Sequence, residues 1–519
     1  MLLANHAPAA KPAQMPNPEE NLAVLARGPS ANFAQFLQAA SQALQQDQAA
    51  AAETALLAAT TAAPGDPQLW QHLGLARRAL QDSAGAHHAF TRAAQLLPQD
   101  PLIAHSLART ALEAGYPALE SFNRARLLAP HDGSVALGRI AALLAQGLGA
   151  KGCEQLAASL EHSPGWTEGH IALARLTAQV DPTQPIGASL RRAIAAFPAA
   201  GALWQTLFQV LLEARDYPAV IAAVAEASAA LGPSKELDWI EAISRSELGE
   251  AEAAQTLFDR LPFPTDGEAA VWPIRNFIRL GRYDEACLLA QQPFDGPGEA
   301  ALWPYRALLW RLLGDERWHW LEGDPRLIQT YDLSAELGPI DQLAELMRGL
   351  HRGHGAPLDQ SVRGGTQTDG NLLARAEPEI RHLRRALLAA TQEYVAQLPP
   401  FDPTHPMLLA RRAPLNVAGS WSVRLAGQGF HTDHVHQQGW ISSACYLVVP
   451  PDDPALLEGG WLAFGECRAL LPQFKAFRTE APSPGKLVLF PSIMWHGTRA
   501  FGSGERMTTA FDIARPMQA

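Results

Sequence analysis

The chain has 519 residues, of which 47% are hydrophobic and 18% are charged. This length exceeds what one hydrophobic core usually supports, so we expect at least two domains. Lys and Arg number 41 against 52 Asp and Glu, which gives a net charge of −11. Such a chain offers no broad positive field for a phosphate backbone, which argues against nucleic acid as a partner.

The N-terminal residues and the cysteines bear on the cellular compartment in which the protein is expected. Residues 1–30 are rich in Pro, Asn and Ala and lack the apolar run of a secretory signal, so a disordered leader is expected there. No segment reaches about 18 apolar residues without a charge, which predicts no membrane span. The four cysteines lie far apart and form no CxxC pair. This favours a reducing, cytoplasmic location over a disulfide-stabilised one.

Residues 31–325 carry an internal repeat of helices. Ala and Leu recur there at spacings of three and four, which predicts successive amphipathic helices. Prolines follow helix ends at intervals of 34, 32, 34, 34 and 35 residues, at Pro64, Pro98, Pro130, Pro164, Pro198 and Pro233. Six positions after each proline, a helix begins its buried face, at Trp70, Ala104, Ala136, His170, Trp204 and Trp239.

The clearest unit is DPQLWQHLGLARRALQDSAGAHHAFTRAAQLLP, with Trp70, Gly74, Ala86 and Phe90 in order. It resembles the tetratricopeptide repeat, whose small residues let two helices approach while large residues fill the remaining space. The resemblance implies an α-solenoid with a groove that binds a protein or an extended peptide. Alternatively, the array serves as a spacer or as the surface through which the chain forms a homodimer.

The composition changes in the last two hundred residues. Residues 326–403 are expected to be a helical connection that includes one helix at 383–399. Residues 404–519 contain short alternating apolar runs separated by Pro and Gly turns, which predicts a small barrel or sandwich of the jelly-roll kind. The expected strands are 420–425, 443–449, 460–465, 486–490 and 508–513.

Histidines cluster at the start of one expected strand, in HTDHVHQQGWISSACYLVVP. Residues two apart on a strand point to the same face, so either His434 with His436 or His431 with Asp433 can present two ligands together. His496 follows another expected strand sixty residues later. Two ligands from one strand and a histidine from another form a facial arrangement that leaves positions open on an Fe(II) ion.

Ten residues beyond His496 stands Arg506, and Thr508 follows it on the same strand face. A guanidinium beside a hydroxyl is suited to receive a carboxylate, because the guanidinium can form a bidentate charge-assisted pair. The stretch SVRGGTQT at 361–368 is expected to be a turn entering the first strand, with a substrate-facing loop as the alternative.

The segments HVHQQGWISSACYLVVP, GGWLAFG, PGKLVLFPSIMWHG and GERMTTAFDI together resemble the 2-oxoglutarate/Fe(II) oxygenases related to prolyl 4-hydroxylases. The resemblance spans about residues 415–515 and implies a double-stranded β-helix that uses Fe(II), 2-oxoglutarate and O2. It implies that His496 is a metal ligand and that Arg506 and Thr508 hold the far carboxylate of 2-oxoglutarate. Tyr446 is a weaker candidate for a hydrogen bond to the co-substrate.

The resemblance favours His434 and His436 as the other two ligands, since this family commonly has His-x-His where the wider superfamily has His-x-Asp or His-x-Glu. His431 and Asp433 form a His-x-Asp string three residues upstream and stay as the alternative pair. Three imidazoles would be neutral ligands and would offset less of the metal charge than a set with a carboxylate.

The fusion of a repeat array to such a domain suggests a dioxygenase that hydroxylates a peptide or protein side chain delivered by the array. A non-catalytic adaptor with a structural cupin-like domain is one alternative. An oxygenase of a small molecule, with the repeats used only for assembly, is the other.

Overall fold

The computed structural model describes residues 33–517 except 47 and 295. The leader expected at residues 1–30 lies outside the described residues. The chain forms two compact units. The first contains residues up to Arg139 together with Ala374–Ala376, and the second contains Ile140–Leu373 and Glu377 onwards.

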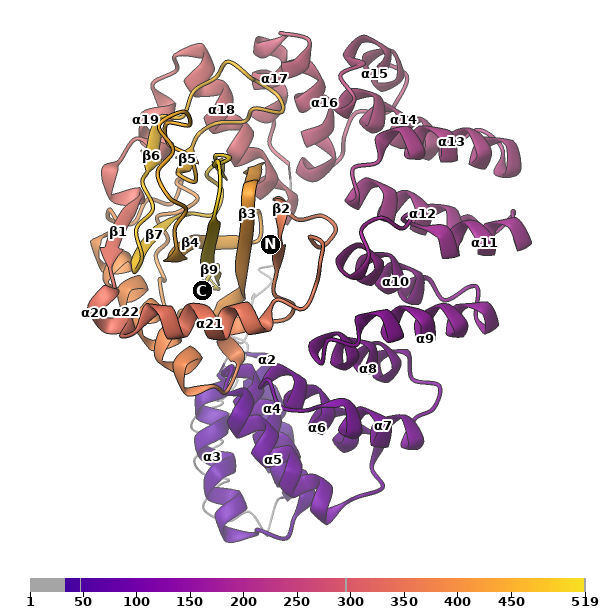
Figure 1. The fold of residues 1–519 in the computed structure, drawn as a ribbon, viewed down its shortest axis with the longest axis vertical. Coiled ribbons are helices and arrows are strands. Elements are labelled where there is room, and N and C mark those ends of the chain that lie inside the picture. Colours follow the sequence, from indigo (N-terminus) through magenta and orange to yellow (C-terminus); the bar gives the residue numbers. More distant parts are fainter. Residues whose placement is uncertain (1–32, 47, 295, 518–519) are drawn as a thin grey trace, which may run out of the picture. The chain divides into compact units, whose positions relative to one another are not determined.

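The first unit consists of paired helices (Figure 1). They are α2 (Phe33–Gln45), α3 (Ala49–Ala62), α4 (Pro67–Ala79), α5 (Ser83–Leu96), α6 (Pro101–Glu113), α7 (Leu119–Leu128) and the start of α8 (Gly133–Ala145). A Cβ atom on Gly74 would lie 2.6 Å from the Phe90 ring, so α4 and α5 approach as closely as the repeat pattern requires. The predicted helical repeat is confirmed.

A hydrogen bond recurs at the position six residues after the repeat proline. The indole N–H of Trp70 donates to the Pro64 carbonyl at 2.9 Å. The Trp204 indole does the same to Pro198 at 3.0 Å in the second unit. The bond gives the buried ring N–H of Trp204 a partner, and at both positions it closes the turn that precedes the helix.

The helical repeat continues into the second unit, and further helices follow between and after the first strands. They are α9 (Gly149–His162), α10 (Thr167–Val180), α11 (Ala188–Ala196), α12 (Gly201–Glu213), α13 (Tyr217–Leu231), α14 (Lys235–Glu247), α15 (Ala251–Phe258), α16 (Gly267–Arg279), α17 (Tyr283–Ala290), α18 (Trp303–Leu313), α19 (Arg317–Glu322), α20 (Ser334–Leu337), α21 (Ile340–Leu350) and α22 (Pro378–Gln397). Three 3-10 turns accompany them, at Pro297–Leu302, Pro325–Leu327 and Leu372–Ala374.

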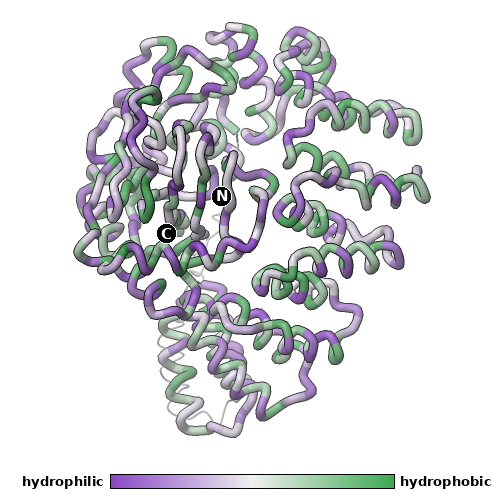
Figure 2. Tube along the Cα trace, in the orientation of Figure 1, coloured by the Kyte–Doolittle hydropathy of each residue, from purple (hydrophilic) through white to green (hydrophobic). Residues whose placement is uncertain are grey.

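Apolar and polar residues alternate along the helices (Figure 2). Among the helices of the described ranges, none combines the length and the apolar character that a membrane crossing requires.

The second unit also contains an antiparallel sheet whose strands run in the order β1-β7-β4-β9-β3-β8-β5-β6, with β2 paired to β3. The strands are β1 (Gln329–Asp332), β2 (Val362–Gln367), β3 (Val417–His434), β4 (Gly439–Val448), β5 (Leu462–Phe464), β6 (Arg478–Glu480), β7 (Lys486–Pro491), β8 (His496–Thr498) and β9 (Glu505–Ala514). Arg478 of β6 donates to the Ile328 carbonyl just before β1 at 2.9 Å. The sheet therefore curls until the two ends of its strand order approach each other, as expected for a jelly-roll fold.

The two faces of the sheet have different neighbours. On β9, Met507, Phe511 and Ile513 belong to the core that packs against α21 and α22. Their alternate neighbours Arg506 and Thr508 line a pocket on the concave face. The two-residue period of the strand thus separates the structural core from the pocket.

All five strands expected from the sequence form. The segment 326–403 differs from the expected helical connection because it also contributes β1 and β2 to the sheet. Helices at the end of the array share a core with the sheet domain, where Trp495 donates to the Pro304 carbonyl at 3.1 Å. The expected boundaries at 325 and 403 stay predictions.

Glu322 at the end of α19 provides a test of this packing. Its side chain is buried, one carboxylate oxygen accepts from the Trp318 indole at 3.0 Å, and the other has no hydrogen-bond partner in the described chain. Burial raises the pKa of Glu322 to about 7 from a value of 4.5. The folded state therefore loses stability relative to the unfolded state as pH rises from 4.5 through about 7.

We expect Glu322→Gln to remove this pH dependence. Between pH 5 and pH 8 the free energy of unfolding of the unsubstituted protein should fall by about 1 to 3 kcal/mol relative to the variant, measured by thermal or denaturant unfolding at both pH values. Parallel pH profiles for the two proteins would contradict the buried, protonated state of Glu322.

Candidate functional site

Three histidines from two strands and a turn converge on the concave face of the sheet. His434 ends β3, His436 lies in the turn that follows, and His496 begins β8. One ring nitrogen from each lies within 4.8 Å of the other two. Three imidazole nitrogens at this separation can be shared by a single metal ion.

Each of these imidazoles has a hydrogen-bond acceptor at its Nδ1 atom. The His434 Nδ1 lies 2.8 Å from the Thr432 carbonyl, and the His496 Nδ1 lies 2.9 Å from the Met494 carbonyl. The His436 Nδ1 lies 2.7 Å from a carboxylate oxygen of Asp512. Because all three acceptors require a proton on Nδ1, the three Nε2 atoms keep their lone pairs, as metal-binding histidines do.

Burial keeps the rings of His434 and His496 neutral. It lowers the pKa of His434 to about 3, with a further contribution from the neighbouring His436. Burial also lowers the pKa of His496 well below its usual value. These two neutral imidazoles fit a divalent metal ion, because neither has to release a proton at pH 7 when the ion binds.

An irregularity in β3 decides which residues face the pocket. His431 pairs with Thr498 of β8 and His434 pairs with His496, but the register shifts between these two pairs. The simple two-residue alternation is therefore broken. His431 and His434, three residues apart, both line the pocket, whereas Asp433 is absent from its lining.

Asp433 is instead held by Arg468 behind β8. Its two carboxylate oxygens accept from the Arg468 guanidinium at 2.6 and 2.8 Å and from the Arg468 backbone N–H at 2.7 Å. Gly497 makes room for this pair, because a Cβ atom there would lie 2.3 Å from an Asp433 oxygen. In the alternative pair, therefore, only His431 faces the pocket, and Asp433 does not.

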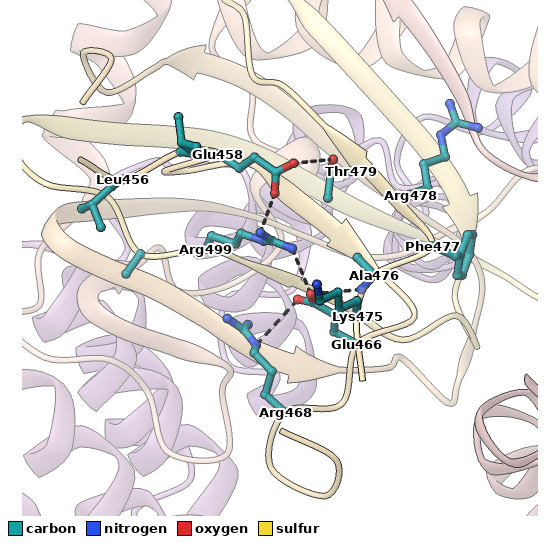
Figure 3. Close-up of a pocket in the computed structure, with 12 residues that line it drawn as sticks. Leu456, Glu458, Glu466, Arg468, Lys475, Ala476, Phe477, Arg478, Thr479 and Arg499 are labelled. Carbon is teal, nitrogen blue, oxygen red and sulfur yellow. Dashed lines mark hydrogen bonds and ion pairs between the residues drawn. The ribbon is translucent and has the colours of Figure 1, made fainter. Parts of the chain in front are cut away.

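Arg468 is part of an ionic network that lines a second pocket of about 680 Å³ (Figure 3). In that pocket Arg499 pairs with Glu458 and, at 2.9 Å, with Glu466. Glu466 in turn lies 3.9 Å from Arg468. This network holds the Arg468 side chain in position, and Arg468 in turn binds the Asp433 carboxylate.

The pocket of the three histidines is small, about 60 Å³, and also contains Arg506 and Thr508. Arg506 is only 2% exposed, and its Nε atom donates to the Gly460 carbonyl at 3.0 Å. No carboxylate in the described ranges forms an ion pair with it. A buried guanidinium without an anionic partner is costly, so this side of the pocket is suited to a carboxylate ligand.

Tyr446 lies next to Arg506, with the guanidinium 5.0 Å from the centre of its ring. Its hydroxyl is buried and has no hydrogen-bond partner among the residues described. Tyr446 is not part of the pocket lining, so the expected contact with a co-substrate stays a prediction. An unsatisfied buried hydroxyl beside an unpaired guanidinium nevertheless fits a site that a polar ligand completes.

Sequence reasoning missed two residues that support the histidines. Asp512, which accepts from His436, continues the strand-face series of Arg506, Thr508 and Ala510, and extending that alternation by one step would have found it. Ser361 begins the stretch expected to be a turn, but it lines the pocket and its hydroxyl contacts two histidine rings. Only tertiary pairing of β2 with β3 brings it there, so the sequence gives no signal for it.

One family model matches part of the sheet domain. Residues 419–512 match the family model described as "Putative 2OG-Fe(II) oxygenase". The matched span contains the three histidines, Arg506, Thr508 and Asp512. The expected resemblance of this part of the chain is confirmed. No curated protein matches the chain.

Three solved structures illustrate the similarities of the two parts. A tetratricopeptide repeat protein from Parabacteroides merdae has 16% identity and a TM-score of 0.29, and the match covers 44% of this chain and 91% of that one. A prolyl-4-hydroxylase from Pseudomonas putida has 16% identity and a TM-score of 0.25, covering 37% and 94%. HygX from Streptomyces hygroscopicus, with nickel and 2-oxoglutarate bound, has 13% identity and a TM-score of 0.27, covering 37% and 84%.

Metal binding by single variants tests the assignment of the three histidines. We expect His434→Ala, His436→Ala and His496→Ala each to lose stoichiometric Fe(II) binding under anaerobic conditions, because each removes one of three donor atoms. Asp433→Ala should retain it, since Asp433 is engaged by Arg468. Metal content after desalting measures the outcome.

Thermal unfolding of the metal-free proteins serves as the control for folding. Loss of iron in Asp433→Ala, with iron retained in His436→Ala and both proteins folded, would show that the alternative pair binds the metal.

Proposed function

We propose that the chain is a 2-oxoglutarate- and Fe(II)-dependent dioxygenase that hydroxylates a side chain of a peptide or protein. One observation carries the proposal. A single pocket is lined by three imidazoles that can share one metal ion and by a buried Arg506 that has no carboxylate partner among the described residues. The family match over residues 419–512 supports the same chemistry.

In this proposal His434, His436 and His496 hold Fe(II). Arg506 and Thr508 receive the far carboxylate of 2-oxoglutarate, and we assign to Tyr446 a further hydrogen bond to the co-substrate. When bound, Fe(II) supplies oxidative decarboxylation of 2-oxoglutarate by O2, so that R–H, 2-oxoglutarate and O2 give R–OH, succinate and CO2. The protein contributes the orientation of the co-substrate and the exclusion of water from the pocket.

Apolar side chains support the exclusion of water. Val423, Leu462 and Phe490 line the pocket together with the polar groups, and each is buried. Asp512 strengthens His436 as a donor by accepting its Nδ1 proton, and Ser442 donates to the same carboxylate at 2.7 Å. These contacts hold the ring orientation without placing a negative charge on the metal itself.

A peptide or protein substrate is proposed because the part of the array from Ile140 onwards shares one compact unit with the sheet. The segment before β2 contacts the inner helices directly, since the Asp359 N–H donates to the Glu213 carbonyl at the end of α12 at 3.0 Å. The residues that follow, Gln360 and Ser361, line the pocket. A chain bound along the helices near α12 would therefore have its side chains close to the reacting centre.

Release of succinate tests the enzymatic proposal against the adaptor alternative. With Fe(II), ascorbate and O2, the protein should convert 2-oxoglutarate to succinate slowly without substrate. Arg506→Leu should weaken 2-oxoglutarate binding by about tenfold or more, because a buried charge-assisted pair is lost. Mass spectrometry of succinate and calorimetry of 2-oxoglutarate binding are the measurements.

An adaptor would give no succinate above a protein-free control and would bind no 2-oxoglutarate in the presence of Mn²⁺. His496→Ala is the matched control for turnover, because it removes the metal and leaves Arg506 in place.

Fractionated substrates test the peptide proposal against a small-molecule oxygenase. We expect a peptide or protein fraction of a cell extract to stimulate succinate formation and to gain one oxygen atom on a side chain, detected by mass spectrometry. Stimulation by the low-mass fraction alone would support the small-molecule alternative instead.

A further inference from the structure

A fourth histidine, His431, faces the same pocket but does not belong to the converging three. The register shift in β3 turns it to that side. Its ring lies nearly parallel to that of His434, with 6.0 Å between centres and 19° between planes. Its Nδ1 lies 2.9 Å from the Ser361 hydroxyl, and its Nε2 has no hydrogen-bond partner in the described parts of the chain.

The Ser361 hydroxyl lies between two histidines. Its oxygen is 2.9 Å from the His431 Nδ1 and 3.3 Å from the His434 Nε2. A hydroxyl has one proton to donate. While the His434 lone pair is free, the hydroxyl can donate to it and accept from a protonated Nδ1 of His431.

A metal ion on the His434 Nε2 atom removes that option, because the lone pair is then used for coordination. The His431 Nδ1 becomes the histidine acceptor left within reach of the Ser361 hydroxyl. The His431 tautomer in which Nδ1 accepts from the Ser361 hydroxyl carries its proton on Nε2. That tautomer presents an N–H donor to the pocket that also contains Arg506.

We propose that His431 is a co-substrate-binding residue whose Nε2–H donates to the carboxylate of 2-oxoglutarate that Arg506 receives. This inference rests on the proposed function. Arg506 supplies the charge, and His431 supplies a neutral directional donor from the neighbouring strand β3.

The position of Ser361 is fixed from both sides. Its backbone carbonyl accepts from the Thr432 N–H at 3.0 Å, which ties it to β3. The segment that precedes it is attached to the helical array, where the N–H groups of His354 and Gly355 donate to the Gln179 carbonyl at 2.7 and 3.0 Å. The geometry of the hydroxyl between the two rings is thus set by the fold rather than by a mobile loop.

Binding of 2-oxoglutarate to the Mn²⁺-loaded protein, measured by calorimetry, tests the role of His431. His431→Phe should raise the Kd about tenfold or more, because it keeps a ring but removes the donor. His431→Gln should stay within about threefold of the unsubstituted protein, because its amide places an N–H near the position of Nε2. Both variants should bind Mn²⁺ as the unsubstituted protein does.

A second measurement needs no substitution at His431. Nitrogen NMR of histidine-labelled, Zn²⁺-loaded protein should show His431 with its proton on Nε2, with Ser361→Ala losing this preference. Zinc is used because it is diamagnetic and is bound by imidazole nitrogens.

Three results would overturn the inference while leaving the proposed function intact. They are an unchanged Kd for 2-oxoglutarate in His431→Phe, loss of Mn²⁺ by that variant, or a proton on Nδ1 in the zinc-loaded protein. Absence of 2-oxoglutarate binding by the unsubstituted, metal-loaded protein would instead remove the proposed function, and this inference with it.

Discussion

The pocket depends on where three imidazole protons are placed. The Nδ1 atoms of His434, His436 and His496 each face an oxygen acceptor, and one ring nitrogen of each histidine lies within 4.8 Å of the other two. Two of the acceptors are backbone carbonyls, one within β3 and one in the turn between β7 and β8. The third is the Asp512 carboxylate, which is oriented by β9. Ligand geometry is therefore a direct product of sheet pairing.

A donor set of three neutral imidazoles has an electrostatic consequence. A divalent ion held this way keeps its full charge, and the Asp512 carboxylate acts through His436 rather than on the metal. Arg506 adds another positive charge to the same pocket. A dianionic co-substrate would therefore neutralise most of the charge in the pocket, which explains in physical terms why such a site should favour 2-oxoglutarate over a neutral ligand.

Strand periodicity allowed part of this site to be predicted. On β9, Arg506 and Thr508 face the pocket while Met507 faces the core, as the two-residue period requires. Near the end of β3 the same rule holds for His434 and His436, which both line the pocket, but not for the alternative pair His431 and Asp433. A register shift between His431 and His434 separates them, and such shifts depend on pairing with other strands rather than on local sequence.

Tertiary pairing also explains what the sequence could not show of the fold. The strands β1 and β2 lie in a segment with weak local strand signals and form only against β7 and β3. Pairing of β2 brings Ser361 to the histidines, and the residues before it meet α10 and α12. The helical repeat, in contrast, was evident from the spacing of its prolines and from Gly74 opposite Phe90. Each unit uses the same local helix packing, so the same residue types recur at the same positions.

The most direct test of the account is the anaerobic visible spectrum of the protein with Fe(II) and 2-oxoglutarate. Bidentate binding of a 2-oxo acid to Fe(II) produces a charge-transfer absorption that neither component gives alone. The account predicts that this absorption appears at one equivalent of each and is absent when Fe(II) or 2-oxoglutarate is omitted. A protein that binds Fe(II) stoichiometrically but develops no such absorption at saturating 2-oxoglutarate would contradict it.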